Sequence, residues 1–189
     1  MRFINPKKLA ALIFVALIGV VPPAQALVIY NSFGPGDSFK PDRWAIGGAS
    51  SDSGYQGHAE FFIPGVSGDL SSIQVAAGTQ LTGTRLSNFA IAQDNGSGVP
   101  GTVLESFNGV VNIDGVLNIN SILQPLLQAG TKYWLVDGPT AANSYNGWCL
   151  NNQGIVQSYA VEFSPGNWVG NPRLSSTALP SRAALSGSM

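Results

Sequence analysis

Residues 89–107 read Phe89-Ala-Ile-Ala-Gln-Asp94-Asn95-Gly96-Ser-Gly98-Val-Pro100-Gly101-Thr-Val-Leu-Glu-Ser-Phe107, and this stretch decides the fold class. Two apolar, strand-like segments flank a turn rich in Gly, Asn, Asp and Pro. Gly and Asn accept positive backbone φ angles and Pro fixes its own, so the chain is expected to reverse direction here. The stretch therefore predicts a β-hairpin whose strands lie at 88–93 and 102–107.

Short alternating segments of the same kind recur along the chain, whereas helical periodicity is nearly absent. Besides the hairpin they lie at 27–30, 44–46, 58–63, 72–77, 111–120, 133–136, 147–150 and 158–163. About nine or ten short strands with frequent turns predict an all-β protein, an antiparallel β-sandwich of jelly-roll type.

Three of these segments carry more detailed expectations. The run Tyr133-Trp-Leu-Val136 is apolar on both faces and predicts a central strand. Segment 111–120 either forms one strand or is split by a hairpin turn at Asp114-Gly115. The best helical candidate, 121–129, is limited to one turn at most because Pro125 lies inside it.

The first 26 residues have the pattern of an export signal. Basic residues precede an apolar run at 9–21, and Ala24-Gln-Ala26 has the small-x-small pattern that signal peptidase recognises. The apolar run has about 13 residues, fewer than the roughly 20 that span a bilayer. We expect cleavage after Ala26, a secreted or cell-surface protein, and no stable membrane insertion afterwards. An uncleaved anchor is the alternative.

The remaining chain suits one domain, a β-sandwich over 27–170 followed by a Ser/Ala-rich tail at 171–189. Whether 179–186 adds a last edge strand stays open. After cleavage, six basic residues face ten acidic ones, a formal charge of −4. Because the sequence has no basic cluster, nucleic acid is not an expected partner.

The faces of segment 58–63 are assigned by its alternation. Ala59, Phe61 and Ile63 share one face and are expected to point to the core. His58 and Glu60 would then point outward, which makes His58 a solvated surface residue. His58 is the only histidine of the chain and no Gly-x-Ser-x-Gly elbow is present, so a Ser-His-Asp triad is not expected.

Three glutamates leave a catalytic alternative open. Glu60, Glu105 and Glu162 lie on predicted strands, and two acids on one face could support glycoside hydrolysis. Their spacing also fits ordinary outward positions of alternating strands, and nothing places them together. No catalytic residue is therefore assigned, and the protein is predicted not to be an enzyme.

Two further features are expected to be structural. Cys149 is the single cysteine, which excludes an intrachain disulfide, and the flanking Trp148 and Leu150 favour a buried, inert thiol. Asp94 and Asn95 offer oxygen donors that suit Ca²⁺, yet Asp-Asn-Gly is first of all a turn-forming sequence. Turn formation is the preferred interpretation, so no metal or cofactor is assigned.

Aromatic side chains among Asn, Gly and Ser indicate where a ligand would bind. Flat rings stack on the apolar faces of pyranoses while amides bind their hydroxyls. The densest cluster, and hence the candidate glycan site, consists of Asn143, Tyr145, Asn146, Trp148 and Asn151. The alternative is that these rings cap the end of the core, as Trp often does in β-sandwiches.

Six segments carry a family resemblance through their order along the chain. They are Tyr30-Asn-Ser-Phe-Gly34, Trp44-Ala-Ile-Gly47, Leu70-Ser-Ser-Ile-Gln-Val-Ala76, Asp94-Asn-Gly-Ser-Gly-Val-Pro-Gly-Thr-Val-Leu-Glu105, Ala129-Gly-Thr-Lys-Tyr-Trp-Leu135 and Asn143-Ser-Tyr-Asn-Gly-Trp148. Together they resemble the choice-of-anchor R domain family of exported bacterial β-sandwich proteins. The resemblance implies export and a sandwich fold and brings no catalytic residues. It also implies a C-terminal Pro-Glu-Pro sorting signal; since no such motif follows Pro172, simple secretion is the expectation.

The observations together predict a secreted, non-catalytic β-sandwich protein of the cell surface or extracellular matrix. An extracellular polysaccharide is its expected partner. Two alternatives stay open: a divergent glycoside-active hydrolase on the same fold, and a purely structural exoprotein.

Overall fold

The computed structural model describes residues 26–79, 82–177, 179 and 181–186. Residues 1–25 lie outside this part of the chain, so the export signal and its cleavage stay predictions. Apart from a 3₁₀ turn at Pro35–Asp37, all described elements are strands, and every pairing between them is antiparallel. No helix in the described part is long and apolar enough to cross a membrane. The predicted all-β sandwich class is confirmed.

Six strands form the first sheet. From edge to edge they are β12 (Trp168–Thr177), β11 (Val156–Glu162), β3 (Gly57–Phe62), β9 (Tyr133–Pro139), β5 (Leu86–Asp94) and β6 (Pro100–Val111). β9 is a central strand, as its two apolar faces predicted. β5 and β6 form the predicted hairpin, with Phe89 opposite Phe107 and Ile91 opposite Glu105.

Seven strands form the second sheet. They are β1 (Leu27–Asn31), β2 (Lys40–Gly47), β4 (Gly68–Thr79), β7 (Gly115–Asn120), β8 (Leu126–Leu127), β10 (Tyr145–Leu150) and β13 (Ser181–Leu185). One edge of β4 pairs with β7 and β8, and the other pairs first with β13 and then with β10. β1 and β2 complete the sheet beside β13 and β10. The long strand β4 is therefore the centre of this sheet.

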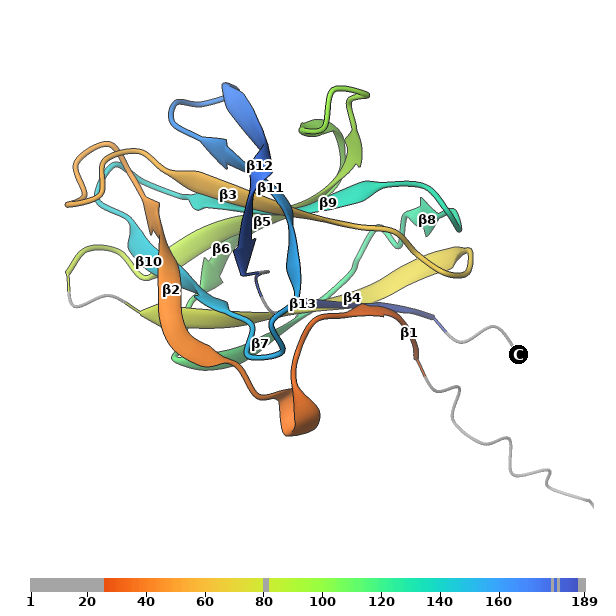
Figure 1. The fold of residues 1–189 in the computed structure, drawn as a ribbon. Helices are drawn as coiled ribbons and strands as arrows, with labels where there is room; N and C mark the ends of the chain where they lie inside the picture. Colours follow the sequence, from red (N-terminus) through yellow and green to blue (C-terminus); the bar gives the residue numbers. More distant parts are fainter. Residues whose placement is uncertain (1–25, 80–81, 178, 180, 187–189) are drawn as a thin grey trace, which may run out of the picture.

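The two sheets pack face to face, and Figure 1 shows β3, β9 and β5 in one layer above β4, β7 and β13 in the other. The main core lies between the layers. Ile73 and Val75 of β4 are fully buried there with Ile91 of β5, and Leu135 of β9 joins them. Their alternation with polar residues along β4 is the one that the sequence predicted.

The predicted faces of β3 were wrong. His58, Glu60 and Phe62 point into the sandwich and are buried, whereas Ile63 lies beyond the strand and is 47% exposed. Ala59 and Phe61 contact a second, smaller apolar cluster on the outer face of the six-stranded sheet. Because this sheet is apolar on both faces, the more apolar side of β3 did not identify the main core.

Segment 111–120 is split near Asp114-Gly115, but not by the predicted hairpin turn. β6 ends at Val111 in the six-stranded sheet, and β7 begins at Gly115 in the seven-stranded sheet. The connection is therefore a crossing between the layers and not a hairpin. Segment 121–129 contains the two-residue strand β8 and no helical turn.

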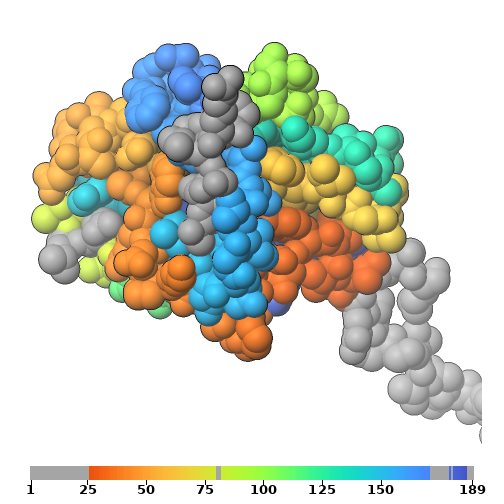
Figure 2. Space-filling model, in the orientation of Figure 1, coloured from red at the N-terminus to blue at the C-terminus, as the bar shows by residue number. Residues whose placement is uncertain are grey.

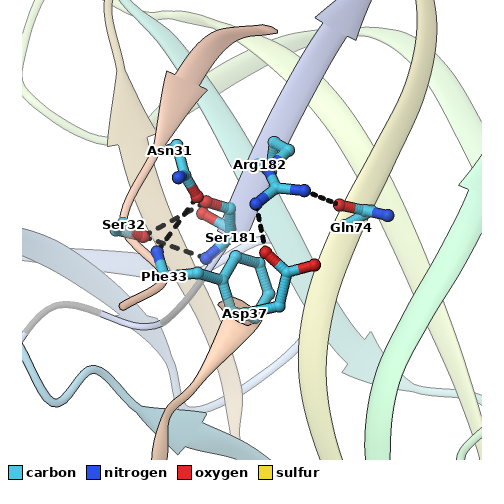
Figure 3. A network of polar contacts seen from close by, with 7 residues as sticks. All are labelled: Asn31, Ser32, Phe33, Asp37, Gln74, Ser181 and Arg182. Carbon is cyan, nitrogen blue, oxygen red and sulfur yellow. Dashed lines mark hydrogen bonds and ion pairs between the residues drawn. The ribbon is translucent and has the colours of Figure 1, made fainter. Parts of the chain in front are cut away.

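Strands of both sheets continue beyond residue 170, where the sequence predicted a tail with an open question of a last edge strand. β12 continues to Thr177, and β13 follows as an interior strand with β1 on one side and β4 on the other. Polar contacts fix β13 in place (Figure 3). Ser32 and Ser181 exchange hydrogen bonds, and Arg182 donates to Gln74 Oε1 at 2.8 Å and forms an ion pair with Asp37. The last strand thus belongs to the centre of the sheet.

Candidate functional site

The predicted glycan cluster does not form a binding surface. Trp148 lies on β10, points into the main core and is only 1% exposed. Asn146 is fully buried and its Nδ2 donates to the carbonyl of Leu86 at 2.9 Å. A ring enclosed in the core cannot stack on a sugar, so Trp148 is a core residue in this fold.

Two other members of that cluster, Asn143 and Asn151, form hydrogen bonds with neighbouring loops. Asn151 is buried; its Nδ2 donates to Ile155 O at 2.8 Å, and its Oδ1 accepts from Ile155 N at 3.1 Å. Asn143 is exposed and its Oδ1 accepts from Thr84 Oγ1 at 3.0 Å. Tyr145 is half-buried on β10. The chain therefore separates these five residues between core, turns and surface.

Several polar side chains of β3 and β9 lie inside the main core. His58 and Asp137 are register partners on these strands, and both are buried. Burial lowers the pKa of His58 to about 4 and raises the pKa of Asp137 and of Glu60 well above the usual value. His58 is therefore neutral at pH 7 and enclosed, which contradicts the predicted surface position.

The three glutamates of the hydrolase alternative are buried and engaged with the chain itself. Glu60 accepts from Tyr30 Oη at 3.3 Å and from Gln157 Nε2. Glu162, on the outer face, accepts from Tyr55 Oη at 2.9 Å. None of the three is solvated: Glu60 points inward, whereas Glu162 points outward as predicted but is covered.

Glu105 is an anchor for the turn that follows β7. Its Oε1 accepts from the backbone N–H groups of Ile122 and Leu123 at 2.7 and 3.0 Å, and its Oε2 accepts from Ser121 Oγ at 2.5 Å. Glu105 is buried on β6. Its carboxylate is thus used to hold a loop.

Cys149 is buried, as predicted, and its thiol is free. Burial raises its pKa to about 11, so the reactive thiolate is scarce at neutral pH. The Asp94-Asn95 turn is closed by its own side chains: Asp94 Oδ2 accepts from Gly96 N at 3.0 Å and Asn95 Oδ1 from Ser97 N at 2.8 Å. In the described part of the chain no three His, Cys, Asp or Glu side chains gather as metal ligands would.

The outer face of the six-stranded sheet is unusually apolar. Phe61 on β3 pairs with Trp134 on β9, which pairs with Ala92 on β5. The next row joins Ala59 to Ala160 on β11. Sandwich sheets commonly present polar side chains on the solvent side. Ala59, Ala92, Trp134 and Ala160 are at most 1% exposed, so most of this apolar face is covered and only Phe61 of the named residues reaches the surface.

Two segments rise beside this apolar face and turn it into a cleft. They are the β5–β6 turn and the β11–β12 hairpin, which project on the same side of the molecule in Figures 1 and 2. Gly170 of β12 lies so close to the turn that an added Cβ would meet Gly98 O at 3.0 Å. The two segments thus approach each other above the middle of the sheet.

The resulting hollow, called the outer cleft below, has a volume of about 370 Å³. The sheet contributes Phe61, Trp134, Ser158 and Tyr159, and Lys132 comes from the position just before β9. The two projecting segments contribute Ser97, Gly98 and Gly170. Such a set combines an apolar floor with hydroxyl groups and one cation. It is the arrangement that a polar ligand with one apolar face requires.

Phe61 is the exposed ring of the outer cleft, and its neighbours fix its position. Trp134, 1% exposed, packs against it edge to face with the ring centroids 5.8 Å apart. Trp134 is itself held by a hydrogen bond from its Nε1 to Asp94 Oδ1 at 2.7 Å. Lys132 Nζ lies 5.1 Å from the centroid of the Phe61 ring. The ring is half-buried and preorganised.

Sequence reasoning missed this site because it assigned Phe61 to the core and Trp134 to a strand buried on both faces. The available signal was the run Tyr133-Trp-Leu-Val136, which is apolar on both faces and directly follows Lys132. Comparison with known proteins adds no assignment: no family model matches the chain, and no curated protein matches it.

Proposed function

We propose that this chain is an exported, non-catalytic β-sandwich protein of the cell surface or extracellular matrix that binds polysaccharide in the outer cleft. The observation that carries the proposal is the half-buried Phe61 ring beside hydroxyl and ammonium groups in a hollow of about 370 Å³. The export signal at 1–26 and the resemblance to choice-of-anchor R domains support the extracellular location.

The chemistry of the outer cleft suits a sugar. One face of a pyranose ring is apolar and stacks on an aromatic ring, while its edge carries hydroxyl groups. Phe61 offers such a ring, and Ser97 and Ser158 offer hydroxyl groups that donate and accept hydrogen bonds. The hollow has room for about one or two sugar units, so a polymer would bind through a short segment.

The positions of the glutamates support a non-catalytic role. Glycoside hydrolysis needs two carboxyl groups roughly 5–10 Å apart across the scissile bond. None of the residues that line the outer cleft is an aspartate or a glutamate. The exoprotein with no ligand remains the competing proposal, and binding measurements separate the two.

Binding to a panel of insoluble and soluble polysaccharides tests the proposal. The wild-type protein is expected to be retained by at least one polymer, and Phe61→Ala to weaken that binding at least tenfold. Phe163→Ala removes an equal ring that is 58% exposed and outside the cleft, and it is expected to leave binding unchanged. Ser158→Tyr fills the cleft without deleting packed atoms and is expected to block binding.

Three results would contradict the proposal. They are no retention by any polymer, binding that survives both Phe61→Ala and Ser158→Tyr, and equal losses in Phe61→Ala and Phe163→Ala. Release of reducing ends from a bound polymer would instead favour the hydrolase. Circular dichroism of each variant confirms that the fold is intact.

A further inference from the structure

We infer that the polysaccharide of the outer cleft is acidic, and that one of its carboxylate or sulfate groups pairs with Lys132. The inference rests on the proposed function, because it names the class of ligand for the same cleft. Lys132 is the only charged residue among those that line the hollow. A single cation beside a stacking ring matches a sugar that carries one negative group at its edge.

The charge of Lys132 is free to meet a ligand. The two ion pairs among the described residues, Arg43–Asp114 and Arg182–Asp37, do not involve it. Its ammonium group lies over the Phe61 ring, a contact that leaves its N–H donors available. The side chain is half-buried, so an arriving anion would meet a charge that bulk water screens only in part.

Asp94 is the acidic group closest along β5 to this site, and its oxygens are already in use. Oδ1 accepts from Trp134 Nε1 at 2.7 Å and Oδ2 accepts from Gly96 N at 3.0 Å. The backbone N–H of Asp94 also donates to Lys132 O at 3.3 Å, which fixes the start of the lysine side chain. Asp94 thus positions the floor of the cleft, while Lys132 offers its charge to the ligand.

The attraction is local and does not come from the protein as a whole. The chain without its predicted signal carries a formal charge of −4, which repels a polyanion weakly. Binding of an acidic polymer therefore depends on one well-placed ion pair. Affinity is expected to fall modestly with salt, and this salt dependence is expected to disappear in Lys132→Ala.

Matched polymer pairs test the inference. The pairs are polygalacturonate and alginate, each against its carboxyl-reduced form, and dextran sulfate against dextran. The acidic member of at least one pair is expected to bind about tenfold tighter than its neutral partner. The pairs also separate the carboxylate from the sulfate as the recognised group.

Variants assign the preference to one side chain. Lys132→Ala is expected to abolish the preference for the acidic member, and Lys132→Arg to retain it. Lys40→Ala removes an exposed lysine of β2, in the other sheet, and is expected to change nothing. Neutral polymers that bind as tightly as acidic ones, or a preference that survives Lys132→Ala, would overturn this inference.

The failure of the inference and that of the proposed function look different. Neutral binding that is lost in Phe61→Ala and kept in Lys132→Ala leaves the polysaccharide proposal intact and removes the acidic ligand. No binding by any polymer removes both.

Discussion

At position 58 a histidine ring is enclosed in the main core, and the backbone of Ala45 is the one polar partner that acts on its pKa. It packs edge to face on Trp44 with the ring centroids 4.7 Å apart, and its register partner on β9 is Asp137. A neutral imidazole can occupy such a place, whereas an imidazolium cannot without losing its hydration. Proton uptake by His58 therefore opposes folding.

The stability of the protein is expected to fall in mild acid through His58. Burial lowers the pKa of His58 in the folded protein to about 4, below the usual value of 6.5. The neutral ring therefore contributes fully to the free energy of unfolding above pH 6.5, and this contribution is lost as the pH falls toward 4. The loss amounts to about 3 kcal/mol. Urea unfolding of the wild type and of His58→Phe between pH 7 and pH 4 measures it as a difference.

The two buried carboxyl groups do not obscure this comparison. Asp137 and Glu60 have raised pKa values, so their contribution to stability shrinks as the pH rises, and both proteins contain them. A stability difference between wild type and His58→Phe that is constant from pH 7 to pH 4 would contradict the prediction.

Glu105 is expected to be essential for stability and irrelevant to any chemistry. Glu105→Ala leaves the N–H groups of Ile122 and Leu123 and the hydroxyl of Ser121 without their acceptor, at a cost of about 3 kcal/mol in the free energy of unfolding. Glu105→Gln keeps an acceptor oxygen and is expected to lose about 1 kcal/mol. Urea titrations measure both, and equal losses in the two variants would argue against the anchor.

At the scale of elements, the β5–β6 hairpin depends on glycine where its turn requires positive φ angles. Gly96 has φ of 86°, and no atom lies within 4 Å of the place of an added Cβ. Gly96→Ala is therefore expected to cause backbone strain but no steric clash. The expected loss is about 1–2 kcal/mol. Gly65→Ala, also in open space but without a positive φ, is the matched control and is expected to be neutral. Thermal unfolding of the two variants compares them, and equal stability would refute the strain.

The sequence predicted the positions of the strands better than it predicted which face of each strand points to the core. The hairpin, the central position of β9 and the alternation of β4 follow from local patterns of Gly, Pro and apolar residues. The inward face of β3 could not be read locally, because the outer face carries Ala59 and Phe61 under the outer cleft. The same reason hid the cleft, since it forms only when the β11–β12 hairpin and the β5–β6 turn meet over the sheet.

At the scale of the whole molecule, the C-terminal strand decides whether the seven-stranded sheet forms. A Ser/Ala-rich segment has little apolar periodicity, so the sequence favoured a tail after residue 170. In the fold, Ala183, Ala184 and Leu185 are buried between β1 and β4. Small side chains suit this place because they allow close packing in the centre of a sheet.

Removal of β13 is expected to abolish the fold. A chain that ends at Thr177 exposes the paired edges of β1 and β4 and loses the buried side chains of β13. It is expected to show no cooperative thermal transition and to be cut rapidly by proteases. A chain that ends at Ser186 keeps every described strand and is the control. Native-like melting of the shorter chain would contradict this role of β13.

The pairing of β1 with β13 also affects when the seven-stranded sheet can be completed during synthesis. Leu27 of β1 lies opposite Leu185 of β13, so β1 gains this neighbour only after β13 has been synthesised. Until β13 is available, β1 has no partner among the described strands, and a pairing across so long a sequence separation forms slowly. A polypeptide that moves through a narrow translocation channel from its N-terminus onward would therefore complete the β1 edge of the sheet only after β13 had passed.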